Sequence, residues 1–499
     1  MKVLFIYPDF PEGKKKAGDE EWGFYSEGLA SVSSVLKEAG HDVELYHLRE
    51  KVSRDEFLST VKKHKPDLVS FSLRTNNLPD VVQYIPFLKK EMDVPIICGS
   101  YHATLFPEEI LKISGVDMVC IGEAEYPMRD LCDAMEAGKP YDNIKSIWVK
   151  TKDGIRKNPI MPLVENLDDL PLPDFDLFDF KNLTSSKIYT AGVMLSRGCF
   201  FNCTYCCNHT VKNLYPNKNK YHRVRSPENS IKYLKKLLKN HRYIKYITFW
   251  DNNLSLPRDW CVNFLKLYKK EIKLPFGCNL HPETVDEELV KLLKGAGCYR
   301  VHFGVESGNE EFRRRVLRRN MKNSQIKKAF ALCRKYGIST LAYNMINCPM
   351  ETPRETLDTV KLNAKIKATR SLAPVFYPFP GTEAYKMSLK NKLFKPSVNY
   401  TEDILLKNPN YPESQVEFFS LYFRPLVKTY KTIYKLPKGI GKICEKSLDR
   451  ALSSKYLPFK MLNIAMKQER KLLNASKNTL KNKMPKLYVK MRNLRLGKK

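Results

Sequence analysis

The chain has 499 residues, of which 43% are hydrophobic, and its formal net charge is +32. This length allows two to four domains with apolar cores, and no apolar run approaches the roughly 18 residues that would indicate a membrane span. Met1-Lys2 leads straight into the run V-L-F-I-Y without a secretory signal, so we expect a cytoplasmic protein.

The cysteine count bears on the redox state of the chain. Its 13 cysteines are an odd number spread over a long sequence. Small secreted proteins instead pack an even number of cysteines into a short chain. We therefore expect reduced thiols, most of them small buried hydrophobic side chains and a few with a chemical role.

The N-terminal region, residues 1–140, alternates short apolar runs with stretches of helical spacing. The runs lie at 3–7, 43–46, 68–73, 95–99 and 118–122. Short buried strands separated by helices predict a doubly wound parallel sheet, an α/β fold that binds ligands beyond the carboxyl ends of its strands. No G-x-G-x-x-G follows the first run, so a dinucleotide is disfavoured.

Residues 141–186 form a predicted connector. It contains the strand-like sequence I-W-V at 147–149, followed by the acidic segment E-N-L-D-D-L-P-L-P-D-F-D-L-F-D. Prolines in an acidic, extended segment favour a surface linker.

A second alternation of strands and helices occupies residues 187–395. The strand candidates lie at 191–195, 243–250, 274–279, 299–305, 340–346 and 373–377, and Ser226-Pro227-Glu228 is a typical helix start. Six βα units in succession predict a partial (β/α)6 barrel, with its chemistry at the C-terminal ends of the strands. Unusual residues follow the strands there, among them four cysteines, Asp251-Asn252-Asn253, Asn279 with His281, Glu306-Ser307-Gly308 and Asn347-Cys348-Pro349.

The cysteines occur in S-R-G-C-F-F-N-C-T-Y-C-C-N-H, residues 196–209. Cys199, Cys203 and Cys206 have the spacing C-x-x-x-C-x-x-C, and no second ligand pair lies downstream. A structural zinc site needs four ligands, so this set is one short. Three thiolates on a short loop suit an iron–sulfur cluster with one open iron. Cys207 lies outside the spacing and is expected to pack beside the ligands.

This motif, with Tyr205 at its aromatic position, resembles that of radical S-adenosylmethionine (SAM) enzymes. The resemblance implies that Cys199, Cys203 and Cys206 bind a 4Fe-4S cluster whose fourth iron is chelated by SAM. It further implies that Glu306 and Ser307 contact SAM, and that Arg319, or the equally placed Arg318, is a basic contact. Asp251 and Asn252, which end the second strand, are also candidate cofactor-binding residues.

The N-terminal sheet is similar to the cobalamin-binding domain fused to many of these enzymes. The resemblance rests on Gly99-x-x-His102-x-Thr104, Val116-Asp117-x-Val119 and Gly122-Glu123. It implies cobalamin contacts from the small or polar strand-end residues, namely Ser70, Ser72, Gly99, Ser100, Gly122 and Glu123. His102 is as readily a packed loop histidine.

The chain also departs from the family patterns in three places. D-x-H-x-x-G, which supplies a lower axial histidine in some cobalamin proteins, is absent, so no histidine from that motif is expected on cobalt. Ser100 stands where a second glycine is usual, and Asn347 where the fifth barrel strand often ends in glycine.

The two resemblances imply an anaerobic radical enzyme. An electron from a donor such as flavodoxin or ferredoxin would cleave SAM, and the resulting 5′-deoxyadenosyl radical would take hydrogen from an unactivated carbon. In the methylating branch, which we favour, methylcobalamin then supplies a methyl group. A radical cyclase or rearrangement enzyme and a non-catalytic cobalamin sensor are the alternatives. No residue is assigned to catalysis.

The C-terminal region, residues 396–499, is predicted to be helical and basic. From residue 424 onward, 22 Lys and Arg stand against 3 Asp and Glu, a net charge of +19. A merely solvated basic face, an anionic membrane and nucleic acid are the candidate readings. Apolar residues interleaved with basic ones favour an amphipathic surface helix, and with it a lipophilic substrate such as a polyprenoid, whereas nucleic-acid binding lacks the expected stacking aromatics. The apolar residues are Leu457, Phe459, Leu462, Ile464, Met466 and Leu472, and they interleave with Lys460, Lys467, Arg470 and Lys471.

Overall fold

The computed structural model describes residues 1–9, 23–183, 188–395, 406–484, 487–488 and 491. The chain separates into two compact units, each considered by itself. The first contains residues 1–201 and 206–245, and the second contains 202–205, 246–396 and most of the C-terminal region. The predicted connection between barrel and C-terminal region, near 395–396, borders residues 396–405, which lie outside the described residues.

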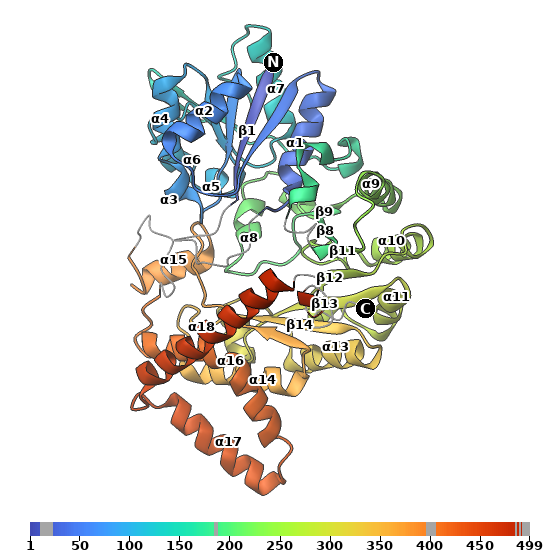
Figure 1. The fold of residues 1–499 in the computed structure, drawn as a ribbon, viewed down its shortest axis with the longest axis vertical. Helices are drawn as coiled ribbons and strands as arrows, with labels where there is room; N and C mark the ends of the chain where they lie inside the picture. The colour runs from blue at the N-terminus through green and yellow to red at the C-terminus, as the bar shows by residue number, and fades with distance from the viewer. Residues whose placement is uncertain (10–22, 184–187, 396–405, 485–486, 489–490, 492–499) are drawn as a thin grey trace. The chain divides into compact units, whose positions relative to one another are not determined.

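The first unit contains a seven-stranded sheet of order β2-β1-β3-β4-β5-β6-β7 (Figure 1). Strands β1 to β5 are parallel, as the five apolar runs predict, and β5, β6 and β7 pair antiparallel. The strands are β1 (Lys2–Pro8), β2 (Asp42–Leu48), β3 (Leu68–Ser72), β4 (Ile96–Gly99), β5 (Met118–Cys120), β6 (Ile147–Thr151) and β7 (Gly154–Arg156).

Helices cover both faces of this sheet, which confirms the doubly wound fold. The strands alternate their side chains between two buried clusters, so that Val3 and Phe5 pack with α1 and α7, while Leu4 and Ile6 pack with α2 and α4. The helices are α1 (Glu27–Glu38), α2 (Arg54–His64), α3 (Leu78–Val81), α4 (Tyr84–Glu91), α5 (Ser100–Leu105), α6 (Pro107–Leu111) and α7 (Glu125–Glu136).

The expectation that the connector is a surface linker was wrong. Its β6 and β7 extend the sheet and cover the edge of β5. In the acidic segment, Leu167, Leu170, Phe175 and Phe178 are all at most 3% exposed. Most of the acidic residues stay exposed, although Asp174 is largely buried beside Lys37 and Ser33. The apolar residues between them are buried, because burial of aromatic and aliphatic area outweighs the extended character that proline imposes.

The chain then supplies the remaining elements of the first unit. Ser226 caps α9 by accepting a hydrogen bond from the Asn229 amide, with Pro227 at the first helical position, as predicted. These elements are β8 (Thr190–Val193), β9 (Ser196–Arg197), α8 (Cys207–Lys212), β10 (Arg223–Val224) and α9 (Pro227–Asn240).

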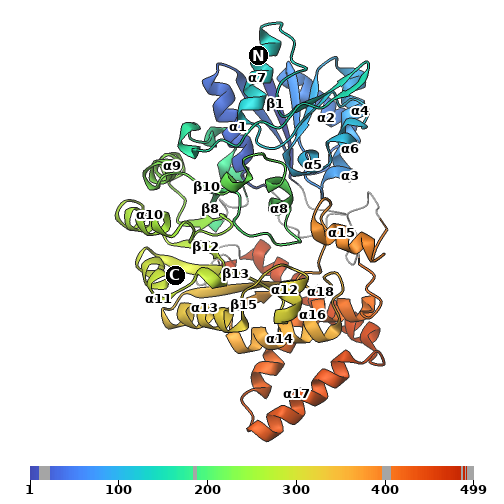
Figure 2. The ribbon, with the colours of Figure 1, turned by 180° about the vertical axis from the view of Figure 1, so that it is seen from behind.

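The second unit contains a parallel sheet of order β15-β14-β13-β12-β11. Together with β8 there are six strands, of which five overlap strands that the sequence predicts. They are β11 (Tyr246–Phe249), β12 (Phe276–Leu280), β13 (Cys298–Glu306), β14 (Ser339–Asn344) and β15 (Arg370–Leu372). In Figure 2, α11 and α13 lie beside these strands. The helices are α10 (Arg258–Glu271), α11 (Glu287–Gly295), α12 (Glu310–Arg315), α13 (Asn323–Lys335), α14 (Pro353–Ile366) and α15 (Glu383–Lys390).

The last predicted strand, 373–377, was misplaced. β15 ends at Leu372, and a single isolated bridge joins Val375 to Ile346. Pro374 has no amide hydrogen to donate to a sheet, and Pro378 follows, so the ladder stops early.

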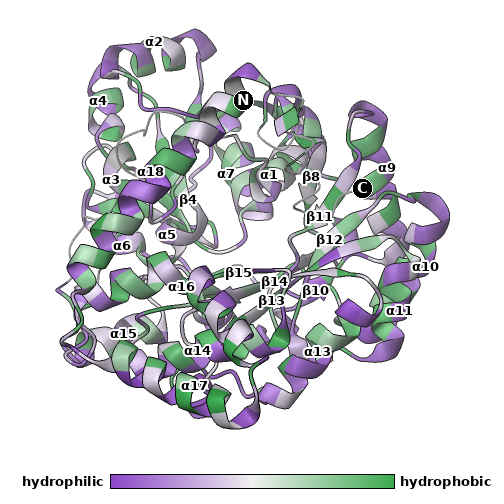
Figure 3. Cartoon of the chain, turned by 60° about the horizontal axis from the view of Figure 1, so that its bottom comes forward, coloured by the Kyte–Doolittle hydropathy of each residue, from purple (hydrophilic) through white to green (hydrophobic). Residues whose placement is uncertain are grey.

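Three helices form the described part of the C-terminal region, which confirms its helical prediction. They are α16 (Glu413–Ile433), α17 (Lys438–Ser453) and α18 (Phe459–Lys483). α16 is largely buried, with Phe419, Phe423 and Tyr430 in a core that also includes Val360 of α14. Hydrophobic and hydrophilic residues alternate along α17 and α18 (Figure 3). Of the helices in the described part of the chain, none combines the length and apolar composition of a membrane span.

Candidate functional site

The cysteine loop, residues 198–222, leaves from β9 and returns at β10. The two strands form a short antiparallel ladder in which Arg223 pairs with Arg197. Gly198, next to Cys199, has φ 78°, and a Cβ atom there would lie 2.1 Å from the Tyr221 carbonyl oxygen. Only glycine fits this left-handed position against the returning chain, so the base of the loop depends on it.

The sulfur of Cys206 accepts a hydrogen bond from a side chain that is itself held by a tyrosine. The Asn208 side-chain amide donates to the Cys206 sulfur over 3.6 Å, and the Tyr221 hydroxyl donates to Asn208 Oδ1 over 3.2 Å. A hydrogen bond with Cys206, together with burial, raises the pKa of Cys207. Cys207 is therefore a protonated neighbour of Cys206, in agreement with its prediction as a packed thiol. Donors aimed at sulfur favour the thiolate form that a metal ligand requires.

Within the second unit, Cys203, Tyr205, Glu306 and Arg319 come together. Arg319 Nη1 lies 3.6 Å from the Cys203 sulfur and 3.4 Å from the Tyr205 hydroxyl, and Arg319 Nη2 donates to the Gly304 carbonyl at 2.7 Å. The Tyr205 hydroxyl bonds the Glu306 carboxylate. Burial raises the pKa of Glu306, while Arg319 and Tyr205 oppose that rise.

Two backbone features make this cluster possible. A Cβ atom at Gly304 would lie 2.4 Å from Glu306 Oε1, so a larger residue would displace the carboxylate. Glu306 itself has φ 63°, a left-handed conformation that is uncommon outside glycine and concentrates at functional sites.

The structure distinguishes the two candidate arginines. Arg318 extends outward, and its guanidinium pairs with the Glu383 carboxylate at 2.6 Å. Arg319 is 9% exposed, and its buried Nε has no hydrogen-bond partner among the described residues. Of the two arginines, Arg319 is the one that lies beside Cys203, and its role as a basic contact stays a prediction.

The other predicted barrel residues are spread along the strand ends. Asp251 is buried, and its carbonyl accepts from the Asn279 side chain at 3.1 Å, whereas Asn252 is exposed. Ser307 Oγ accepts from the Asn309 amide and so supports the start of α12. His281 is buried, and burial and the nearby arginines lower its pKa to about 2, so it is neutral at physiological pH.

Sequence reasoning missed two residues of this region. His302 lies on β13, its Nδ1 is 3.2 Å from Asn279 Oδ1, and burial lowers its pKa to about 4. Strand alternation could have found it, since Val301 and Phe303 are fully buried on the opposite face. Arg313 is fully buried and donates to the carbonyl oxygens of Ser307 and Met321, which fixes the turn after β13. It also donates to Asn323 Oδ1 at 3.0 Å, and no periodicity identifies this arginine because its acceptors lie on other segments of the chain.

The residues of the cysteine loop suit an iron–sulfur cluster chemically. Three cysteines are the required donors, and Asn208 and Arg319 supply N–H groups to two of the sulfurs. Among the described residues, no three Cys, His, Asp or Glu side chains are grouped closely enough to hold a metal ion. The assignment of Cys199, Cys203 and Cys206 as ligands stays a prediction from the motif.

The predicted cobalamin residues line the carboxyl edge of the first sheet. Ser70, Ser72 and Gly99 are only partly buried, at the ends of β3 and β4. Ser100 has φ 79°, which explains why glycine is usual there, and Asn347 at its own strand end has φ 65°. The partly buried, small side chains at this edge suit a flat ligand, and their role as contacts stays a prediction.

His102 and Gly122 face the interior instead. His102 is fully buried, lies 3.1 Å from the Thr75 hydroxyl through Nδ1 and packs on Phe106, so it is a packed histidine. Gly122 has φ 80°, and a Cβ atom there would lie 2.3 Å from the Tyr215 hydroxyl. Tyr215 thus occupies the space that a side chain at 122 would need.

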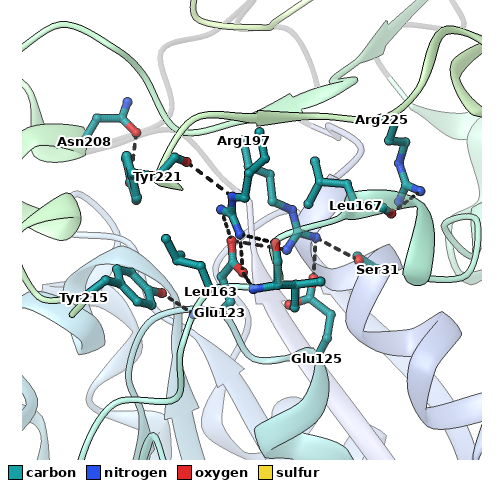
Figure 4. A network of polar contacts seen from close by, with 12 residues as sticks. Ser31, Glu123, Glu125, Leu163, Leu167, Arg197, Asn208, Tyr215, Tyr221 and Arg225 are labelled. Carbon is teal, nitrogen blue, oxygen red and sulfur yellow. Dashed lines mark hydrogen bonds and ion pairs between the residues drawn. The ribbon is translucent and has the colours of Figure 1, made fainter. Parts of the chain in front are cut away.

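Glu123 belongs to a buried charge network that the sequence did not predict (Figure 4). Its carboxylate accepts from Arg223 at 2.6 and 3.0 Å, and Arg197 Nη1 lies 3.5 Å away. Arg197 also pairs with Glu125 and donates to the Ser31 hydroxyl at 3.0 Å. Burial alone would raise the pKa of Glu125, but Arg197, the Ser31 hydroxyl and a backbone amide together lower it. Both arginines come from the β9–β10 ladder, so the base of the cysteine loop is ion-paired to the turn after β5.

Comparisons with known proteins match the two domains that carry these residues. The radical SAM superfamily matches residues 193–362, and the B12 binding domain matches residues 24–132. An uncharacterised methyltransferase of Pyrococcus horikoshii is 26% identical over 442 residues, covering 86% of this chain and 94% of its own.

Two solved structures share the fold. OxsB, a cobalamin-dependent SAM radical enzyme solved with aqua-cobalamin and SAM, superposes with a TM-score of 0.67 at 17% identity, over 91% of this chain and 71% of its own. TsrM from Kitasatospora setae, a radical SAM methyltransferase solved with cobalamin and a [4Fe-4S] cluster, superposes with a TM-score of 0.62 at 17% identity, over 78% and 75%.

The two domains define the cofactors. A radical SAM domain implies a 4Fe-4S cluster and SAM, and a B12 binding domain implies cobalamin. With the cysteine loop after β8 and the doubly wound sheet before it, this chain is a radical SAM enzyme that also carries a B12 binding domain.

Proposed function

We propose that this enzyme transfers a methyl group to an unactivated carbon of its substrate. One observation carries the proposal: a cysteine-loop domain and a B12 binding domain occur in one chain, and a relative that matches 94% of its own length is named a methyltransferase. When bound, the cluster and SAM supply reductive SAM cleavage, and cobalamin supplies a transferable methyl group.

In this proposal Cys199, Cys203 and Cys206 hold the cluster. Arg319 places a permanent positive charge beside Cys203 and leaves its Nε for an acceptor of the bound SAM. The Tyr205 hydroxyl orients the Glu306 carboxylate, which is 9% exposed and so largely shielded from water. Ser70, Ser72, Gly99 and Ser100 would contact cobalamin. Exclusion of water and oxygen at both sites protects the radical chemistry.

The overall reaction balances with two SAM molecules and two electrons. One SAM is cleaved to methionine and 5′-deoxyadenosine, which carries the hydrogen removed from the substrate carbon. The second SAM donates its methyl group and leaves as S-adenosylhomocysteine. The electrons would come from a donor such as flavodoxin or ferredoxin.

A radical cyclase or rearrangement enzyme is the second candidate, and it differs in its products. The test incubates reconstituted enzyme anaerobically with a reductant, methyl-labelled SAM and an extract of the source cells. Methyl transfer predicts label in an extract component, with both 5′-deoxyadenosine and S-adenosylhomocysteine. Formation of 5′-deoxyadenosine together with an altered but unlabelled component would identify a radical cyclase or rearrangement enzyme. Absence of any product of SAM cleavage would identify a non-catalytic cobalamin sensor.

A further inference from the structure

Helix α18 carries exposed apolar side chains, and three of them lie along one face, whereas the exposed Leu473 lies outside that stripe. Met461, Ile464 and Leu472 are 71%, 57% and 71% exposed. Spacings of three and eight residues place them within one stripe at 3.6 residues per turn. Large aliphatic side chains gathered on one exposed face indicate an interaction surface, whereas single scattered ones do not.

The opposite face of α18 is fixed to α16. Phe459 is 4% exposed and belongs to the α16 core, and Leu462 packs against that core. Asn463, 2% exposed, donates to the Ser414 carbonyl and the Glu417 carboxylate at 2.8 and 2.9 Å. The apolar residues predicted to form one amphipathic stripe therefore lie on two faces of α18. Phe459 and Leu462 pack against α16, whereas Ile464 and Leu472 are exposed. The direction of the exposed stripe is set by tertiary contacts.

Lysines border this stripe. At 100° per residue, Lys460, Lys467 and Lys471 form a row beside Ile464. All three are exposed, and Lys467 is also ion-paired with Glu417. The surrounding residues 424–499 carry +19 of the total charge of +32. An apolar stripe beside a cationic row matches the acyl boundary and the anionic headgroups of a bilayer.

We infer that the Met461–Ile464–Leu472 face of α18 docks on an anionic membrane surface. A second copy of the chain would bring two strongly basic regions together, which electrostatics opposes. A nucleic acid would need successive stacking aromatics, and in the described part of residues 424–491 Tyr456 alone is an exposed aromatic side chain. The inference is independent of the proposed methyl transfer. Docking on a membrane would bring the enzyme close to a lipophilic substrate.

The test is co-sedimentation of the full chain with vesicles of phosphatidylcholine, alone or mixed with phosphatidylglycerol. We expect binding to the mixed vesicles only, weakening as salt is raised. A triple variant with Met461→Ser, Ile464→Ser and Leu472→Ser should bind at least about tenfold more weakly, as should Lys460→Glu with Lys471→Glu. Lys269→Glu with Lys270→Glu on α10 makes the same charge change on another exposed surface and should bind as wild type.

Each outcome decides the inference. Absence of wild-type binding overturns it, as does equal binding by the stripe, lysine-row and α10 variants. Equal binding to neutral and mixed vesicles overturns the role of charge, and displacement from vesicles by RNA at low concentration points to nucleic acid instead. Circular dichroism establishes that the variants are folded. If the serine variant unfolds, comparison of the lysine-row variant with its α10 control still decides whether this face binds the membrane.

Discussion

The positions of the Arg319 and Glu306 side chains depend on which residues surround them. Arg319 reaches Cys203, Tyr205 and the Gly304 carbonyl, and Glu306 fits because Gly304 has no side chain. A buried guanidinium without such partners would be costly. The geometry of this corner therefore rests on several residues far apart in the sequence.

The cysteine assignment predicts a sharp difference among four adjacent thiols. Cys199→Ala, Cys203→Ala and Cys206→Ala should each abolish the 4Fe-4S absorbance and most bound iron after anaerobic reconstitution, because the cluster loses a covalent ligand. Cys207→Ala is the matched control and should retain iron, because Cys207 is a hydrogen-bonded neighbour of Cys206 and is not predicted to be a cluster ligand. A Cys207 variant that loses the cluster, or a Cys203 variant that keeps it, would contradict the assignment.

The burial of Glu351 predicts that the free energy of unfolding depends on pH. It is 1% exposed, accepts hydrogen bonds from the Cys348 amide and the Thr356 hydroxyl, and burial raises its pKa from 4.5 to about 8. Between these values the folded state holds a proton that the unfolded chain has released. Stability should therefore fall as pH rises from 5 to 8, by up to about 1.4 kcal/mol per pH unit from this group.

Urea unfolding of wild type and Glu351→Gln at several pH values checks this. The glutamine stays neutral, so the variant should lack this decline and gain stability relative to wild type as pH rises. Glu469→Gln, an exposed position on α18, is the control and should follow the wild-type curve. Parallel curves for wild type and Glu351→Gln would show that Glu351 is ionised in the folded protein.

At the scale of elements, the β9–β10 ladder links the cysteine loop to the sheet of the first unit. The ladder provides Arg197 and Arg223, and the turn after β5 provides Glu123 and Glu125. Charged groups in such a place are stable only as pairs, because each alone would lose its hydration without compensation. The ladder and the turn should therefore loosen together.

Arg197→Met tests this coupling. It leaves Glu125, 3% exposed, without its guanidinium, which should cost about 3–5 kcal/mol. We expect a lower midpoint of thermal unfolding, faster proteolysis within residues 198–222, and reduced iron uptake. Adding Glu125→Gln should restore part of the stability by removing the isolated charge. Arg129→Met, which removes the exposed pair with Asp130 on α7, is the control. Equal unfolding of Arg197→Met and this control would refute the coupling.

At the scale of the whole molecule, the basic C-terminal region is part of the second unit's core. Leu426, Val427, Tyr430 and Ile433 of α16 are all at most 8% exposed. Burial of each large apolar side chain contributes about 1.5–3 kcal/mol, and a typical domain is stable by only about 5–15 kcal/mol. The region is therefore both a basic surface and a folding element.

A chain ending before Arg424 should consequently fail to fold cooperatively in its second unit. We expect low solubility and loss of the second unit's unfolding transition by calorimetry. A chain ending at Lys483 is the matched control, because it keeps α16, α17 and α18, and it should unfold as the full chain does. Cooperative folding of the shorter chain would mean that α16 contributes little to stability.

Much of the fold was predictable because a buried strand is recognisable from its own short run of apolar residues. Apolar runs identified β1 to β5 and five of the six later strands, and Ser226-Pro227 marked the start of α9. The cysteine motif identified the family for the same reason, since its spacing is a property of one short segment. The prediction was wrong for the connector, whose apolar residues are buried between acidic residues and prolines. It was also wrong for the last strand, because pairing stops before Pro374.

The sequence by itself determined the two sheets, their order along the chain, the cysteine loop and the excess of positive charge near the C-terminus. Tertiary structure alone decided that Arg319 rather than Arg318 meets Cys203, that Glu123 pairs with Arg223, and that Phe459 is buried while Leu472 is exposed. Periodicity shows which face of an element is apolar, but a charged or polar side chain is placed by partners a hundred residues away. Those partners become neighbours only when the chain folds.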